Sequence, residues 1–599
     1  MSSSAALFTA KRTTGGSFLI EDLLPEDVFT LEDFSKEQKQ IAEMTSEFAD
    51  ERVLASIQEI EAKNFDVTRQ LMREAGDLGL MRVDVPEEYG GFGLDKITST
   101  LISDRLSVSG SFSVTYSAHV GIGMFPLLWF GTPLQKEKYL SRLASGEWIG
   151  AYALSESSAG SDAMNIRTRA ALSPDGKYYI LNGEKMWISN AGLANLFTVF
   201  AKVDGEKFTA FLIEAGTVGL TIGKEEHKLG LRGSSTCPLF LADCHVPVEN
   251  VLGEIGKGHH IAFNILNVGR YKVGAVTIGA ARNTLRDGIH YARERIAFGK
   301  PITSFGLVQE KIAETAAGIY AGETVLYRVI GAIDAALSTV DKSAPDYSKQ
   351  VQQAIEDFAV ECSILKFWGS EMLERAVDHS LQLHGGYGYV EEYPVERAYR
   401  DARVNKIFEG TNEINRLITS GRTFKRAAQG RLALLPAIKK AMDEVSTGAC
   451  GHAAFEGPLA HERALLADAK KLALFCAGLA LERYTSDLSD EQEVSGRFAE
   501  IIAEILVLDS VVLRTEKMSG RNPLAIKLAR YYGARSMSVI KNAAERLIGV
   551  VAEGVALREK MAGFRRLTEH DPINTAAIGR DIASAMVAAG RYTIEDYVV

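Results

Sequence analysis

The sequence predicts a mainly α-helical protein with a central β domain, and two changes of texture along the chain support this fold class. Residues 35–150 carry apolar side chains at spacings of three and four, which is the helical period. Residues 151–252 instead form short β-branched and aromatic segments, and helical spacing returns from residue 259. With 599 residues, 46% hydrophobic and 24% charged, the chain is expected to form about four domains, each burying its own core.

Residues 1–34 are interpreted as an extension ahead of the first helical domain, which is predicted to span residues 35–150. Residues 1–20 hold Lys11, Arg12, several hydroxyl side chains and no acidic residue. A transit peptide is one interpretation of this pattern, but a loose solvated start is favoured. Ser35 followed by Gln38 is predicted to form a capping box that opens the first long helix.

Residues 151–262 are predicted to form the β domain. Its segments, such as KYYILNGEKMWIS and FTAFLIEA, are separated by Gly, Asn and Asp. Short strands without helices between them predict an antiparallel barrel or sandwich rather than a parallel sheet. This pattern excludes the doubly wound dinucleotide-binding fold.

Two helical regions follow the β domain. Residues 263–430 are predicted to form a helical bundle with Gly-rich interruptions at 298–300 and 384–388, and residues 431–599 an additional helical domain. Apolar residues between 498 and 513 fall on one helical face, and Asn522 followed by Pro523 predicts a helix start.

Several classes of function are excluded by what the sequence lacks. The net charge of −10 argues against a nucleic-acid binder, and no apolar stretch approaches the ~20 residues of a membrane span. The five cysteines have no CxxC spacing and are predicted to be reduced thiols. Because GxGxxG, Walker, HExxH and GxSxG patterns are missing, we expect no metal site and no Rossmann, kinase or serine hydrolase chemistry.

Three stretches carry residue types suited to ligand binding. SESSAGSD (155–162) could bring hydroxyls and N–H groups to a polar ligand, although a polar surface loop is the commoner interpretation. Trp187 in KMWISN (185–190) is more often a core residue than a wall against a planar ring. Arg293 and Arg295 precede a Gly turn and could clamp a diphosphate, or form a solvated helix end.

A fourth stretch, residues 384–416, contains a candidate base. Glu409 lies in a Phe-Glu-Gly-Thr turn just ahead of a helix expected from Asn412. A carboxylate held by such a turn beneath an apolar cleft could have a raised pKa and accept a proton. On the local sequence alone, a helix-terminus carboxylate without chemistry is the commoner interpretation.

The ordered series SESSAGSD, KMWISN, RIAFGKPI, QLHGGYGY and IFEGTNEI closely resembles the acyl-CoA dehydrogenase family over about residues 35–429. FGLVQEKIAE, LASGE and the C-terminal extension look most like its very-long-chain branch. The resemblance implies a helical domain, a β-barrel, a four-helix bundle and an extra C-terminal helical domain. It also implies FAD-dependent dehydrogenation of long-chain acyl-CoA to trans-2-enoyl-CoA in fatty acid β-oxidation.

The resemblance assigns the site residues. Glu409 would be the base, and its backbone N–H would polarise the thioester carbonyl together with a flavin hydroxyl. Relatives that carry the base ahead of the equivalent of Arg270 have it where this chain has Gly269, so Glu409 has no rival. The residues expected to contact acyl-CoA are Ser161, Asn267, Arg270 and Gly410. Those expected to contact FAD are Tyr152, Ala153, Leu154, Ser155, Gly160, Ser161, Trp187, Ile188, Ser189, Arg295, Phe305, Gln382, Leu383, His384, Gly385, Gly386, Thr411, Asn412 and Glu413.

Some positions depart from the family pattern or leave its meaning open. Thr-Glu-Pro is Ser155-Glu156-Ser157 here, Ala297 and Gly306 replace Thr and Gln, and Asn267 replaces a frequent Asp. The small residues Ser117, Ala118, Gly121 and Gly123 are near the expected floor of the acyl pocket. They would either leave a deep pocket for long acyl chains or allow close helix packing.

The resemblance also implies partners. Arg295, Phe305 and Gln382–Gly386 would meet FAD bound by a neighbouring subunit, so a homodimer is expected. Electron-transfer flavoprotein would accept the electrons, and the last domain is a hypothetical site of peripheral membrane contact. The expected location is the bacterial cytoplasm, or the mitochondrial matrix in a eukaryote. The alternatives are a flavoprotein scaffold of the same fold that assists assembly, which the intact Glu409 disfavours, and an acyl-CoA oxidase.

Overall fold

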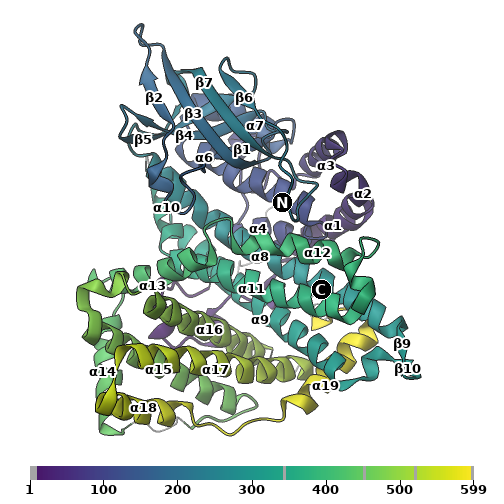
Figure 1. Cartoon of the computed structure of the whole chain (residues 1–599), viewed down its shortest axis with the longest axis vertical. Coiled ribbons are helices and arrows are strands. Elements are labelled where there is room, and N and C mark those ends of the chain that lie inside the picture. Colours follow the sequence, from purple (N-terminus) through teal and green to yellow (C-terminus); the bar gives the residue numbers. More distant parts are fainter. Residues whose placement is uncertain (1–9, 342–343, 345, 450–453, 519–521, 595–599) are drawn as a thin grey trace.

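The computed structural model describes residues 10–341, 344, 346–449, 454–518 and 522–594. Figure 1 shows the β domain at one end, the first helices beside it, long helices through the middle and the last helices at the opposite end. The predicted order of helical, β and helical regions is confirmed. No helix among these residues combines the length and the apolar composition needed to cross a bilayer.

The first helical region begins as the sequence predicts. The Ser35 hydroxyl accepts a hydrogen bond from the Gln38 backbone N–H at 3.1 Å, and the Gln38 side chain accepts one from the Ser35 N–H at 3.0 Å. This confirms the capping box. The helices of the region are α1 (Lys36–Phe48), α2 (Ile57–Glu61), α3 (Phe65–Asp77), α4 (Lys96–Arg105), α5 (Gly110–Ser117), α6 (Phe125–Phe130) and α7 (Pro133–Ala144).

The start of the chain is partly packed, and the prediction of a loose solvated start is wrong for residues 15–20, whereas Lys11, Arg12 and Thr14 are exposed. Phe18 and Leu19 are buried in the main hydrophobic core. The Gly16 N–H donates to the Glu361 carboxylate at 2.6 Å, far away in the sequence. The segment lacks helical or strand periodicity, so its apolar side chains were not recognised as core residues. Residues 1–9 lie outside the described residues.

The β domain contains one eight-stranded sheet in the order β6-β7-β3-β2-β4-β5-β8, with β1 also paired to β4. Most neighbours are antiparallel, but β1 and β2 both run parallel to β4, which the purely antiparallel expectation missed. The strands are β1 (Gly150–Ala153), β2 (Arg169–Leu172), β3 (Tyr178–Ser189), β4 (Leu196–Val203), β5 (Lys207–Glu214), β6 (Leu220–Ile222), β7 (Thr236–Pro247) and β8 (Val251–Leu252).

A bundle of long helices follows the sheet. The two predicted Gly-rich interruptions are real: one is a small hairpin and the other a turn after α11. The elements are α8 (Gly258–Glu294), β9 (Ile296–Ala297), β10 (Lys300–Pro301), α9 (Gly306–Leu337), α10 (Tyr347–Glu356), α11 (Ala359–His384), α12 (Pro394–Ala402) and α13 (Asn412–Ala428). The bundle places the turn before α13 beside Gly269 in the first half of α8, which positions the site described below.

The last region is also helical, as predicted. Asn522 caps α17 through hydrogen bonds from the N–H groups of Leu524 and Ala525, and Pro523 occupies the first helical position. Because α16 lies between several helices, it is buried on most of its surface rather than on one face. The helices are α14 (Leu434–Thr447), α15 (Ala460–Tyr484), α16 (Gln492–Lys517), α17 (Pro523–Val551), α18 (Gly554–Thr568) and α19 (Thr575–Ala589).

The helical regions share one core, contrary to the expectation of a separate core for each domain. One cluster of buried apolar side chains extends from Phe18 to Ile594, whereas the sheet interior has a cluster of its own. Buried Arg514 of α16 joins the regions by pairing with Glu32 at 2.9 Å and with Glu323 of α9 at 2.7 Å. The described cysteines, Cys237, Cys244, Cys362 and Cys476, are free and buried, and Cys450 lies outside the described residues.

Candidate active site

Glu409 lies in a turn that points its side chain at α8. Glu409 and Gly410 have φ angles of 56° and 84°, so the backbone is left-handed at two successive residues. Thr411 then caps α13, its hydroxyl accepting a hydrogen bond from the Ile414 N–H at 3.3 Å. Glu409 therefore precedes the cap of α13. Its sequence position favoured a carboxylate at the helix terminus, but Glu409 is not on the first turn of α13.

Gly269 on α8 provides the space that the carboxyl group occupies. A Cβ atom at residue 269 would lie 2.5 Å from Oε2, 2.6 Å from Cδ and 2.8 Å from Oε1 of Glu409. These distances are far below ordinary contact between heavy atoms. The Glu409 side chain can therefore occupy this position only if residue 269 has no side chain. Residue 269 is also the position at which some relatives are expected to carry their base.

The surroundings of Glu409 give its carboxyl group the properties of a base. The Oε2 atom is buried, and it has no hydrogen-bond partner among the described residues. Burial raises the pKa of Glu409 to about 7, although the nearby charges of Arg270 and Lys366 act in the opposite direction. A carboxyl with a pKa near neutrality is well suited to accept and release a proton.

Two residues from outside the turn hold it in place. Lys366 of α11 donates to the Gly410 carbonyl at 2.6 Å and to the Asn412 side chain at 2.8 Å. Asn415 donates to the carbonyls of Gly410 at 2.8 Å and Thr411 at 3.0 Å. The carbonyls of the turn are therefore engaged, whereas the Glu409 N–H has no acceptor among the described residues. Such a donor is available for a ligand oxygen.

Arg270 and Asn267 continue the same face of the site. Arg270 is almost completely buried and donates to Asn267 Oδ1 at 2.9 Å and to the Glu409 carbonyl at 3.4 Å. The structure thus brings together three of the predicted substrate residues, Asn267, Arg270 and Gly410. The fourth, Ser161, is exposed on the loop of the β domain.

The β domain contributes a polar loop and an exposed aromatic ring. Glu156 forms a buried ion pair with Lys185 at 2.7 Å and accepts a hydrogen bond from the Thr168 hydroxyl, which fixes the loop that begins at Ser155. Trp187 is 59% exposed, so its interpretation as a core residue is wrong. It lies at a register shift between β3 and β7 with a φ of 57°, and such bulges redirect side chains.

The other predicted cofactor residues form two groups. On the β domain, Tyr152, Ala153, Leu154 and Ile188 are buried, and the pKa of Tyr152 is raised by burial and by the charge of Glu409. At the far end of α11, Gln382, Gly385 and Gly386 are exposed. A Cβ atom at Gly385 or Gly386 would meet nothing within 4 Å, so this turn leaves open space.

Arg295 and Phe305 accompany the turn at the end of α11. Arg295 lies over the Tyr387 ring at 5.8 Å, and His384 stacks on Tyr291 at 4.2 Å. Lys366 and His384 are 18 residues apart on α11, which corresponds to about 27 Å along the helix. This group is therefore well separated from Glu409 within one chain.

Small residues near the expected acyl pocket have different surroundings. A Cβ atom at Gly123 would lie 2.8 Å from backbone atoms of Gly150, so close packing explains this glycine. A Cβ atom at Gly121 would lie 3.6 Å from the Lys272 side chain, which is an ordinary van der Waals contact. The site also contains residues that the sequence analysis missed, above all Lys366 and Asn415. A single Lys within the apolar run CSILKFWG was the available signal for Lys366.

The arrangement fits a flat redox cofactor. An exposed indole and a hydroxyl-rich loop lie on the β domain, and the described residues leave an unpartnered carboxyl oxygen on the helical side. An indole offers an apolar face for a ring system, and hydroxyl and N–H groups suit its polar edge. The donor set contains no cluster of groups suited to a metal ion among the described residues.

Comparison with known proteins agrees with this arrangement. Sequence models of the acyl-CoA dehydrogenase N-terminal, middle and C-terminal domains match residues 35–147, 151–244 and 256–423. A further model, also described as an acyl-CoA dehydrogenase C-terminal domain, matches residues 468–566.

Two of three relatives match nearly the whole chain, and the third matches part of it. A probable acyl-CoA dehydrogenase of Bacillus subtilis (strain 168) is 44% identical over 97% of this chain and 98% of its own length. The crystal structure of an acyl-CoA dehydrogenase complexed with FAD from Bacillus anthracis has a TM-score of 0.95 at 44% identity, over 97% of this chain and 100% of that one. The human mitochondrial very long-chain specific acyl-CoA dehydrogenase is 41% identical over 59% of this chain, a match that spans about half (52%) of its own length.

Proposed function

Because the chain belongs to the acyl-CoA dehydrogenase family and is an FAD-dependent acyl-CoA dehydrogenase, we propose that Glu409 is the base that removes the α-proton of the substrate. The observation that carries this proposal is the buried carboxyl of Glu409, without a hydrogen-bond partner among the described residues and with a pKa raised to about 7. A base needs an unengaged oxygen and a proton affinity near neutrality, and this carboxyl has both.

The neighbours of Glu409 have distinct parts in the proposed reaction. The Glu409 N–H donates a hydrogen bond to the thioester carbonyl, which stabilises the negative charge that develops as the α-proton leaves. When bound, FAD supplies the acceptor for the hydride that leaves the β-carbon. Lys366 and Asn415 keep the turn rigid, so that the carboxyl and the N–H keep their relative positions.

Two features support proposed contacts for the cofactor. The loop from Ser155 to Ser161, Trp187 and the start of α13 are the proposed contacts of the isoalloxazine ring. Asn412 is buried, and its side-chain amide donates to Ser370 at 3.0 Å and to Glu371 at 3.0 Å. Because these hydrogen bonds hold Asn412 in place, we assign it the part of positioning its neighbours Thr411 and Glu413.

A homodimer is the second part of the proposal. Arg295, Phe305 and residues 382–386 are too far along the bundle to serve the ring beside Glu409 of the same chain, so they would meet the FAD of a partner. The exposed Phe298, Leu307 and Tyr389 near this group support a contact surface, because large exposed apolar patches mark association sites.

Long acyl-CoA is the proposed substrate class, with electron-transfer flavoprotein as the electron acceptor. The similarity to very long-chain specific enzymes supports the substrate class.

Anaerobic mixing of the FAD-loaded enzyme with acyl-CoAs of graded chain length tests these proposals. We expect long chains to bleach the flavin rapidly, and Glu409→Gln to abolish bleaching while FAD stays bound. Glu392→Gln, which removes an exposed carboxyl elsewhere, serves as the matched control. A flavin that stays oxidised with every chain length would favour a scaffold, and rapid reoxidation by air without an acceptor protein would indicate an oxidase.

A further inference from the structure

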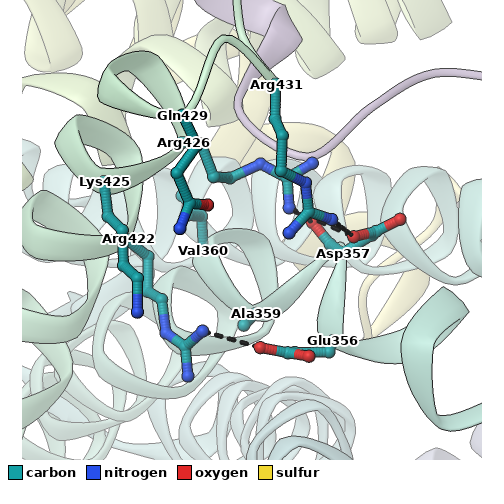
Figure 2. Close-up of a pocket in the computed structure, with 9 residues that line it drawn as sticks. All are labelled: Glu356, Asp357, Ala359, Val360, Arg422, Lys425, Arg426, Gln429 and Arg431. Carbon is teal, nitrogen blue, oxygen red and sulfur yellow. Dashed lines mark hydrogen bonds and ion pairs between the residues drawn. The ribbon is translucent and has the colours of Figure 1, made fainter.

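A cavity lies away from Glu409, between the start of α11 and the end of α13. It has a volume of about 200 Å³, and Figure 2 shows the side chains that line it. Ten residues separate Arg422 in the cavity from Asn412 at the start of α13, which corresponds to about 15 Å along the helix. The lining residues are Glu356, Asp357, Ala359, Val360, Arg422, Lys425, Arg426, Gln429 and Arg431.

The charges around this cavity do not cancel. Arg422 pairs with Glu356 at 2.7 Å, while Arg426 and Arg431 both pair with the single carboxylate of Asp357. Lys425, also on the wall, has no ion-pair partner among the described residues. Four cationic side chains therefore face two carboxylates on the wall. The buried carboxyl of Glu361, in the first turn of α11, also interacts electrostatically with Arg426, and the cavity still keeps an excess of positive charge.

The most buried of these cations lacks hydrogen-bond acceptors. The Arg426 side chain is only 7% exposed. Its Nη1 donates to the Asp357 carbonyl at 3.1 Å and to Oδ1 at 3.3 Å, but Nε and Nη2 have no acceptor among the described residues. Leaving charged donors unsatisfied in a buried place costs free energy. An oxyanion in the cavity would bring acceptors to this guanidinium.

The backbone adds to the attraction for an anion. Ala359 and Val360 are the first two residues of α11, and they form part of the wall. The first N–H groups of a helix have no partner within the helix, and the helix dipole favours negative charge at that end. This contribution comes in addition to the unsatisfied guanidinium and the excess of cations.

We propose that this cavity binds a phosphate group, either as inorganic phosphate or as the phosphomonoester of a larger molecule. A phosphate anion matches the excess of positive charge on the wall, and arginine forks suit its oxygens. A metal cation is repelled by the same charges. The site is separate from the catalytic turn, so its failure would leave the proposed role of Glu409 unaffected.

Calorimetric titration of the FAD-loaded enzyme with inorganic phosphate, at a pH where the dianion predominates, tests the proposal. We expect saturable binding of one phosphate per chain. Lys425→Gln and Arg426→Gln should each weaken binding by roughly tenfold or more. Lys439→Gln, an exposed charge on α14, should leave it unchanged. Because Lys425 is exposed, its replacement keeps the test valid even where Arg426→Gln impairs folding.

Competition identifies the source of the phosphate. Displacement by coenzyme A but not by 3′-dephospho-coenzyme A would assign the site to the 3′-phosphate, and no displacement by either would assign it to free phosphate. The proposal is overturned by an absence of saturable binding, by binding that Lys425→Gln does not weaken, or by displacement by both competitors, which would mean that phosphate occupies a diphosphate site.

Discussion

Replacing Gly269 by Ala tests the geometry of the site with a single methyl group. The added Cβ would lie within 2.8 Å of three carboxyl atoms of Glu409, whereas carbon contacts are ordinarily about 3.5–4.0 Å. The carboxyl must therefore move by about 1 Å. A misplacement of this size lowers the rate by about 10²-fold, or about 2.7 kcal/mol in the barrier.

The same substitution should not weaken the fold. Ala is a better residue than Gly within a helix by about 1 kcal/mol, and residue 269 lies within the long helix α8. The measurements are kcat/KM from anaerobic flavin reduction, FAD content and the melting temperature. Gly421→Ala on α13, where an added Cβ meets nothing within 4 Å, is the control. Full activity of Gly269→Ala would refute the inferred position of the Glu409 carboxyl.

Three further outcomes are expected. Because the base acts as the carboxylate, kcat/KM should rise as the pH increases through about 7, and a profile flat between pH 5 and 9 would contradict this. Lys366→Met removes a charge that lowers the pKa of Glu409, so the pH profile should move to higher pH while kcat falls; an unmoved profile would exclude the coupling. Arg514→Met should destabilise the fold by about 3 kcal/mol in denaturant unfolding, because it removes a buried cation beside Glu323, whereas Lys527→Met at an exposed ion pair should have almost no effect.

Local patterns in the sequence correctly predicted part of the fold. The capping box at Ser35 and the Asn522-Pro523 start involve residues within a few positions of each other, so their chemistry could be read directly. The family motifs identified the fold and singled out Glu409. On its local sequence a raised pKa was only the less common interpretation of Glu409, and burial is the cause of the raised pKa in the structure.

Contacts between distant segments could not be read from the sequence. Lys366 meets Gly410, which is 44 residues away, and no local pattern links the two. The exposure of Trp187 depends on a register shift between paired strands. The phosphate cavity was missed for the same reason, because α11 and α13 each contribute only part of its charge.

The ion pair between Glu32 and Arg514 can form only after most of the chain has been synthesised. The two residues are 482 positions apart, so at about 5–20 residues per second the ribosome needs about 25–100 s to complete the second after the first. Throughout this interval the hydrophobic core that buries Phe18 and Leu19 is incomplete. Phe18 and Leu19 therefore cannot pack against α15 and α16 until these helices have been synthesised.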